Sequence, residues 1–399
     1  MNWVVEIGTI IAHVFMQPFI YLFFLFILMS GYFRIKKDRR NFRAKVYPYF
    51  YEARRTWLVA VTAGIVLSAL AIGFGLVLSL PFALVLGAVM FIVAIGNRFT
   101  WLSASYPLAI TAAVIYFAGI YLQDYIPSSW QPLLDATNLF YVPFLIGVLL
   151  FVETWLLGRV RSKDTFPELI KSGRGKYLGQ HRLKKLAIIP FVTLIPGGWL
   201  EPFNGWPLLD IGGESYGLLV VPYLLGFEYI VKARLATDAS KWLAKGHAVL
   251  AIVVLLIAGA SYKMPMLTVV ALVVAFIGKE VILLIFQSKE KGRTPHFQPS
   301  EKGLLVLGVM PDTPAVDLEL VPGEKIVKVN DIKVNNEEEF YQAVNQNRAF
   351  CKLAVEDLQG EVRFAQRSLY EDDHYKLGIL FVKEQEPYVL EQIAEKQEG

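Results

Sequence analysis

Long apolar runs separated by polar loops constrain this chain more than any other feature of its sequence. A helix needs about 20 mostly apolar residues to cross the hydrocarbon core of a bilayer. Of the 399 residues, 55% are hydrophobic, more than a soluble protein of this length needs to fill its core. We therefore predict a polytopic α-helical membrane region over residues 1–287. Its clearest apolar runs are 10–33, 57–80, 82–95, 107–122, 139–158, 248–262 and 264–286.

Residues 187–231 are also apolar, but they are interrupted. The runs 187–194 and 217–231 are each too short to cross alone, and Pro190 and Pro196 interrupt the surroundings of the first. The pattern fits either two further spans or a re-entrant pair packed inside the protein. The expected total is therefore seven to nine spans, and both ends of that range give the chain the same orientation.

The loop charges predict the orientation. Residues 34–55 and 159–185 carry nine Lys or Arg each, whereas 123–138 and 197–217 carry acidic residues and no Lys or Arg. The positive-inside rule then places the N-terminus outside and the basic loops and the C-terminal part in the cytoplasm. The basic loops could also contact anionic head groups, so membrane lipids are an expected partner. A topology signal alone is the simpler interpretation of these charges.

Beyond a cytoplasmic linker at 288–302, residues 303–382 have the pattern of a small soluble α+β domain. Strands are predicted at 304–309, 325–329, 332–334, 352–356, 361–366 and 376–382. A helix is predicted after Asn336, a good N-cap, because Glu339 falls three positions later as in a capping box. Residues 383–399 read as a polar tail.

The block order GLLVLGVMPDTPA, VPGEKIVKVND, capped helix and strand pair resembles a bacterial PDZ domain. Asp312–Thr313 and Asn330–Asp331 depart from the usual residues of that family but keep turn-forming character. The resemblance implies that a peptide adds as a strand beside a Leu-Gly loop, with its last side chain facing the helix. The expected groove residues are Leu377, Gly378, Ile379, Leu380, Phe340, Ala343, Val344 and Asn347. The alternative is that 377–381 is only a core strand.

No motif in the sequence supports catalysis. None of the five histidines lies in the His-Glu-x-x-His pattern that a zinc protease needs. The stretch from Asn204 to Gly213 is similar to the second metal motif of intramembrane zinc proteases, but one carboxylate cannot hold a catalytic zinc. There is no phosphate-binding loop, and membrane flanks explain the basic, tyrosine-containing stretch better than nucleic acid does. We predict no enzyme activity, no cofactor and no metal.

Four charged residues fall inside predicted spans, near their inner ends: Glu153, Glu228, Lys279 and Glu280. Burying charge in a membrane is costly, so such residues are functional candidates. One hypothesis is a shared ion network or a transport path. The alternative is snorkelling to the interface, with local pairing of Lys279.

The whole arrangement, with the block GYFRIKKDRRNFRAKVY after the first span, resembles the MinJ family of division-topology proteins. The resemblance implies a multi-pass adaptor of the cell membrane, enriched at septa and poles, that links a DivIVA-like coiled-coil protein to a MinD-like ATPase. Two alternatives stay open: an inactive or regulatory relative of PDZ-bearing intramembrane proteases, and a transporter with a regulatory PDZ domain. The residue patterns by themselves support only a membrane-anchored cytoplasmic binding module.

Overall fold

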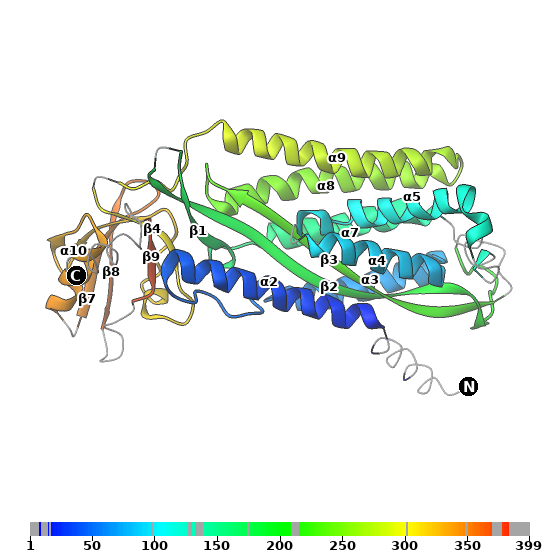
Figure 1. The fold of residues 1–399 in the computed structure, drawn as a ribbon, viewed down its shortest axis with the longest axis horizontal. Helices are drawn as coiled ribbons and strands as arrows, with labels where there is room; N and C mark the ends of the chain where they lie inside the picture. The colour runs from blue at the N-terminus through cyan, green and yellow to red at the C-terminus, as the bar shows by residue number, and fades with distance from the viewer. Residues whose placement is uncertain are drawn as a thin grey trace, which may run out of the picture.

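The computed structural model describes residues 8, 15, 17–96, 99–126, 130–131, 139–173, 175–208, 215–300, 302–347, 350–368 and 377–382. Apolar helices run along the long axis, and a small sheet domain forms one end (Figure 1). Several predicted features lie outside these residues. They are most of 10–16 in the first span, Asp210 in the protease-like stretch, Lys376 at the start of the last strand, and the tail 383–399.

Seven apolar helices of the described chain make up what we call the membrane part, after the spans that the sequence predicts there. They are α2 (Pro18–Phe42), α3 (Trp57–Phe74), α4 (Leu80–Ile95), α5 (Ser105–Tyr121), α7 (Tyr141–Gly158), α8 (Ala236–Ser261) and α9 (Met266–Lys291). Five are long and apolar enough to cross a membrane, and α4 and α5 are shorter. Each coincides with a predicted apolar run, although α2 and α8 extend into the basic segments beyond those runs. Short 3-10 helices lie at Phe99–Leu102, Gln123–Tyr125, Ser162–Asp164 and Pro314–Val316.

The segment 187–231 is a β-hairpin, so the expectation of two helical spans there is wrong. Strands β1 (Phe166–Lys171), β2 (Tyr177–Leu200) and β3 (Tyr216–Val231) form an antiparallel sheet in the order β1-β2-β3. The ladder between β2 and β3 runs from His181↔Val231 to Pro196↔Tyr216. Pro190 lies opposite Pro222. Proline has no backbone N–H, so this pair suits a position of the ladder where neither residue has to donate a hydrogen bond. The predicted loop 159–185 accordingly contains β1 and the start of β2.

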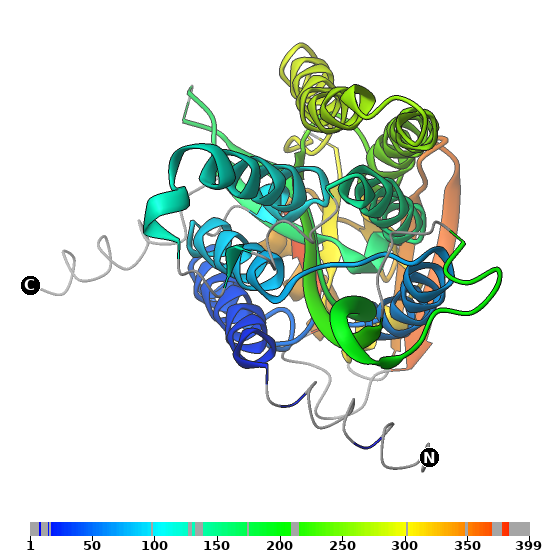
Figure 2. The same cartoon turned by 90° about the vertical axis from the view of Figure 1, so that its right-hand side faces the viewer.

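Helices lie on several sides of this hairpin, as the end-on view shows (Figure 2). The edge of a sheet exposes backbone groups that lipid cannot satisfy. Here backbone groups of a neighbouring segment and side-chain hydroxyls form hydrogen bonds with the edges of the hairpin. Leu194 exchanges backbone hydrogen bonds with the segment after α3, accepting from Leu78 N at 2.9 Å and donating to Leu76 O at 3.0 Å. Further bonds are Val192 N to Ser68 Oγ (2.8 Å), Thr56 Oγ1 to Leu186 O (2.9 Å), Thr193 Oγ1 to Leu76 O (2.7 Å) and Thr100 Oγ1 to Glu228 O (2.6 Å).

Close backbone contact seats α3 on the hairpin. A Cβ at Gly64 would lie 2.2 Å from Pro190 O, so only glycine fits at this position without displacement of backbone. Apolar side chains of both hairpin strands join the main core with those of the surrounding helices; Leu186, Tyr223 and Phe227 are fully buried. The hairpin is therefore the centre around which the membrane part packs.

The C-terminal domain has the elements that its sequence predicts. They are β4 (Leu304–Val309), β5 (Lys325–Val329), β6 (Ile332–Lys333), α10 (Glu337–Gln346), β7 (Phe350–Glu356), β8 (Val362–Ser368) and β9 (Ile379–Phe381). The sheet order is β8-β7-β5-β4-β9, with β6 paired to β5. Asn336 caps α10 as expected, its Oδ1 accepting from Glu339 N at 2.8 Å. The last strand is shorter within the described residues than predicted.

The two ends of the molecule differ in charge. The end of α2, β1 and the start of β2 carry the basic segments and lie beside the C-terminal domain (Figure 1). The tip of the β2–β3 hairpin and the α8–α9 connection lie at the opposite end. The fold thus brings the basic loops and the C-terminal domain together, as the charge pattern predicts.

Candidate functional site

The predicted Leu-Gly loop is a tight turn fixed by backbone hydrogen bonds. Gly378 has φ +84°, and a Cβ there would lie 2.1 Å from Thr313 Oγ1. Met310 N donates to Gly378 O at 2.7 Å and Ala315 N donates to Leu377 O at 2.8 Å. The turn leads into β9, which pairs with β4 and is the last strand of the sheet order. A glycine is therefore required here by the turn itself, whatever else the loop binds.

The predicted groove residues of α10 face the core of the domain. Phe340, Ala343 and Val344 are buried in one cluster with Leu377 and Ile379. The Phe340 ring packs against Phe381, with centroids 5.1 Å apart. Asn347 follows the end of α10 and is exposed. The structure thus brings the predicted α10 and β9 residues side by side, and peptide binding between them stays a prediction.

Leu380 differs from the other predicted groove residues because it points toward the membrane part. It is buried against Val46, Tyr47, Tyr51 and Phe166. Beside it, an adjoining cluster joins the domain to β1 and to the linker after α9; its members are Leu169, Phe297, Leu305, Leu307 and Val382. We call these two clusters together the docking seam. The two faces of β9 thus have different roles, one in the domain core and one in the seam.

The predicted linker is part of this attachment. Phe297 is fully buried, and its carbonyl accepts from Gly179 N at 2.8 Å. His296 N donates to Lys232 O at 2.7 Å. A Cβ at Gly179 would lie 2.4 Å from Leu307 Cδ1, so β2 approaches β4 closely. Residues 292–300 therefore hold the domain against the membrane part instead of leaving it on a free tether.

Polar contacts fix the membrane side of the seam. Tyr47 Oη donates to Thr165 O at 3.1 Å, and Tyr51 Oη donates to Lys163 O at 2.9 Å. Arg34 is buried, pairs with Glu52 at 2.9 Å and donates to Pro48 O at 2.7 Å. This arginine therefore holds the loop that follows α2 in its conformation. The sequence pattern identifies Arg34 only as one of the basic residues that set the membrane orientation, and so does not predict this role. The aromatic residues of the same basic loop were the sequence feature that could have indicated it.

His181 is buried where β2 meets the domain. Thr165 Oγ1 donates to Ser162 O at 2.9 Å, so it accepts from His181 Nδ1 at 2.8 Å. No described group bonds the buried Nε2 atom. Burial lowers the pKa of His181 to about 4, because the charged ring would lose its hydration. The residue is neutral at pH 7, and protonating it works against the closed seam.

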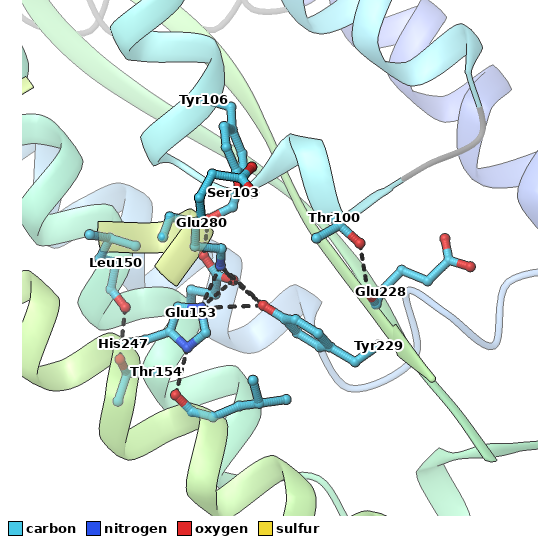
Figure 3. A network of polar contacts seen from close by, with 12 residues as sticks. Thr100, Ser103, Tyr106, Leu150, Glu153, Thr154, Glu228, Tyr229, His247 and Glu280 are labelled. Carbon is cyan, nitrogen blue, oxygen red and sulfur yellow. Dashed lines mark hydrogen bonds and ion pairs between the residues drawn. The ribbon is translucent and has the colours of Figure 1, made fainter. Parts of the chain in front are cut away.

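Two of the four predicted charged residues, Glu153 and Lys279, meet in a buried network among the helices (Figure 3). Lys279 of α9 donates to Glu153 Oε1 of α7 at 2.6 Å and to Tyr229 Oη of β3 at 3.1 Å. Its third contact is with His247 Nε2 of α8. His247 Nδ1 is 2.6 Å from Leu243 O, which can only accept, so Nε2 is free to accept from the ammonium.

The charged groups of this network bond one another inside the protein, which indicates a structural role. An ammonium group has three donors, and each donor of Lys279 has a partner. The second carboxylate oxygen of Glu153 accepts from Ser103 Oγ at 2.5 Å. Glu153, His247 and Lys279 are fully buried, so neither end of the ion pair snorkels to an interface. The network joins three helices, β3 and the turn before α5.

The other two charged residues, Glu280 and Glu228, are not part of this network. Glu280 accepts from Tyr106 Oη at 2.8 Å. Glu228 pairs with Arg182, and its backbone carbonyl faces Thr100, apart from the Glu153 cluster (Figure 3). Within the described residues, no three His, Cys, Asp or Glu side chains gather as a metal site.

Comparison with known proteins gives matches over nearly the whole chain. The cell division topological determinant MinJ of Bacillus subtilis (strain 168) is 32% identical over 391 residues, which cover 96% of this chain and 97% of that protein. A probable cell division topological determinant MinJ of Lacticaseibacillus paracasei is 24% identical over 357 residues, covering 88% and 92% of the two chains. A MinJ of Lacticaseibacillus casei (strain BD-II) matches equally well. No protein-family model matches the chain.

Proposed function

The chain belongs to the MinJ family of cell division topological determinants, and from this premise we propose that it is a membrane-anchored adaptor that positions division regulators at septa and poles. The relatives are named for a role in division and not for a reaction. The observation that carries the proposal is the docking seam, which joins a small sheet domain to the basic end of a membrane part.

The seam supports an adaptor for an energetic reason. A partner that binds a tethered domain must order the tether as well as the interface. A domain already held in place presents its surface at a defined height and orientation, and confinement to a membrane raises the effective concentration of its partners. Individually weak contacts are then sufficient. The basic loops beside the domain support a cytoplasmic location for it.

We propose that residues 303–382 form a PDZ-like binding module whose groove lies between β9 and α10. β9 is at the end of the sheet order, so in the described chain a ligand strand has an edge to add to. Leu380 and Val382 are used by the seam, and Ile379 and Phe381 by the domain core. The ligand strand would therefore add along the outer edge of β9, beside the end of α10 near Asn347. The family resemblance suggests a DivIVA-like coiled-coil protein and a MinD-like ATPase as the bridged partners.

A second candidate surface lies on the other outermost strand. Val362 and Phe364 of β8 are 57% and 64% exposed. Apolar residues on an exposed edge strand invite pairing with another chain. Leu358, in the preceding turn, is also exposed and extends this surface. An adaptor that bridges two proteins needs two surfaces, and β8 and β9 lie at opposite ends of one sheet.

Localisation of a fluorescent fusion in a rod-shaped Gram-positive host tests the adaptor proposal. We expect enrichment at septa and poles for the parent chain. Asn347→Trp should obstruct the β9–α10 groove, and Val362→Ser with Phe364→Ser should remove the apolar β8 surface. Gly378→Asp is a poor groove probe, because its side chain would collide with Thr313 and damage the domain.

For each variant, localisation is measured together with the amount of protein in the membrane and with co-purification of the DivIVA-like and MinD-like partners. Loss of one partner in one surface variant, at unchanged abundance, would assign that surface. Uniform membrane fluorescence of the parent chain would refute the adaptor proposal. Normal localisation and normal co-purification in both variants would keep an adaptor and refute both proposed surfaces.

A further inference from the structure

A cavity of about 460 Å³ opens between the start of α3 and the end of α7. Two basic segments that lie far apart in the sequence converge on it. Arg54 and Arg55 precede α3, Arg159 and Arg161 follow α7, and Lys185 reaches in from β2. A topology signal needs only the number of charges in a loop. It does not require that cations from separate segments face one space.

The cations of this cavity are poorly neutralised. Asp164 is the one carboxylate among the residues that line it. It lies 3.6 Å from Lys185 and 3.9 Å from Arg55. Among the described residues, the other three guanidinium groups have no carboxylate within ion-pair distance. Arg54 lies over the Tyr51 ring at 5.3 Å and Arg159 over the Trp155 ring at 4.9 Å, so aromatic contacts hold two of them in position while their charge stays available.

The position of the cavity indicates what kind of anion fits. Trp57 begins α3 and Trp155 lies near the end of α7, and both are exposed, as tryptophans at a membrane interface are. Val59, Leu156 and Val160 line the cavity but are themselves buried, whereas Leu58 of α3 and Phe151 of α7 are exposed apolar residues of the two helices that flank it. A ligand that satisfies both the arginines and these helix surfaces has an anionic head and an apolar body. A free anion would leave the exposed apolar side chains without a contact.

We propose that this cavity binds the head group of one anionic phospholipid. The phosphodiester contacts Arg54, Arg159 and Arg161, whose forked donors suit phosphate oxygens. The acyl chains follow the exposed apolar side chains of α3 and α7, such as Leu58 and Phe151. Basic pockets between membrane helices on the cytoplasmic side recognise anionic head groups by this combination. The site is independent of which proteins the C-terminal domain binds.

Native mass spectrometry of the purified full-length chain in detergent tests the site, with phosphatidylglycerol and phosphatidylcholine of identical acyl chains as probes. We expect one phosphatidylglycerol to be retained, at least about tenfold more than phosphatidylcholine. Arg54→Gln with Arg159→Gln and Arg161→Gln should abolish that preference. The matched control removes equal charge from exposed positions at the same end, Lys36→Gln with Arg39→Gln and Arg40→Gln, and should retain it.

A second variant blocks the cavity without changing any charge, which covers the case where the arginine variant fails to insert. A Cβ at Gly158 meets nothing within 4 Å, so Gly158→Trp can fill the cavity. Gly119→Trp, at an equally open position on α5, is its control. We expect lipid retention to fall at least about tenfold in Gly158→Trp alone. Equal retention in both tryptophan variants would overturn the proposal, as would displacement of the lipid by excess inorganic phosphate, which would indicate a free-anion site.

Discussion

The protein contains two antiparallel sheets that deal with their edges in opposite ways. The β2–β3 hairpin lies among helices, and side-chain hydroxyls and turn backbone cover its edges. The C-terminal sheet packs one helix, and its β8 strand keeps large apolar side chains exposed. The difference matches the surroundings that the sequence predicts for the two sheets, because water can satisfy an open edge and lipid cannot. The first sheet is consequently a scaffold, and the second has surface to offer a partner.

The scaffold should be the region where single changes cost most, and Lys279→Met is the sharpest case. It leaves the carboxylate of Glu153 buried without its cation. Breaking a buried ion pair typically costs about 3–5 kcal/mol. We expect thermal unfolding in micelles to occur at a much lower temperature, or the protein to fail to accumulate.

Two further variants decide whether the lost ion pair is the cause. Lys241→Met, at an exposed position of α8, should leave the unfolding temperature unchanged. Glu153→Leu combined with Lys279→Met should recover part of the lost stability, because no charge then stays unpaired. A harmless Lys279→Met would contradict the structural role of the network.

Acidification should destabilise the docking seam, where β2 meets the C-terminal domain. The pKa of His181 falls from 6.5 to about 4 in the folded protein, so the unfolded chain binds more protons below pH 6.5. The stability that neutral His181 contributes is complete above pH 6.5 and is lost progressively down to about pH 4. The shift corresponds to at most about 3 kcal/mol.

Thermal unfolding between pH 7.5 and pH 4.5, measured on the parent chain and on His181→Asn, isolates this group. We expect the parent chain to lose more stability than the variant over the range. Parallel pH profiles would mean that the ring is not buried in a closed seam.

Close packing of α3 on the hairpin gives a smaller but specific effect. Gly64→Val places its side chain against Pro190 O, and overpacking of this kind costs about 1–3 kcal/mol. Gly73→Val on the same helix has open space around its Cβ and controls for the change in helix propensity. Unfolding temperatures should separate the two variants, whereas equal values would argue against a backbone contact at Gly64.

The smallest expected effect lies in the C-terminal domain. Asn336→Ala removes the cap of α10, which typically costs about 1 kcal/mol. The loss should appear as faster amide hydrogen exchange in α10, with exchange of β2 and β3 unchanged. Faster exchange in the hairpin as well would mean that the two sheets unfold as one unit, which would break the contrast between them.

The helices and the C-terminal elements were predictable because their signals are local. Apolar runs of the right length marked the membrane helices, and Asn336 with Glu339 marked the start of α10. The hairpin was not predictable in this way. Residues 186–192 are apolar on both faces, although Ile188, Pro190 and Val192 are only half-buried, so they read as a continuous apolar run without the polar alternation of a half-buried strand. Their β-branched content was the remaining signal.

The candidate site was predictable only in part, for the same reason. The Leu-Gly turn and the α10 face could be located from their order in the sequence. The partner of Leu380 could not, because Tyr47 and Phe166 lie in segments hundreds of residues away and only the fold brings them together. The pairing of Glu153 with Lys279 across 126 positions is equally non-local. His247 and Tyr229 carried no sequence signal that linked them to this pair.

Cysteine cross-linking across the docking seam tests most directly whether the C-terminal domain is held against the membrane part. A Cβ at Gly308 would lie 3.4 Å from Pro167 Cβ, close to the spacing of a disulfide. In a Cys351→Ala background, Pro167→Cys with Gly308→Cys should oxidise nearly completely in purified protein and become protected from maleimide labelling. Gly173→Cys with Gly308→Cys should stay reduced. Free thiols at 167 and 308 under the same oxidant, in folded and inserted protein, would contradict the account, because the domain would then move freely on its linker.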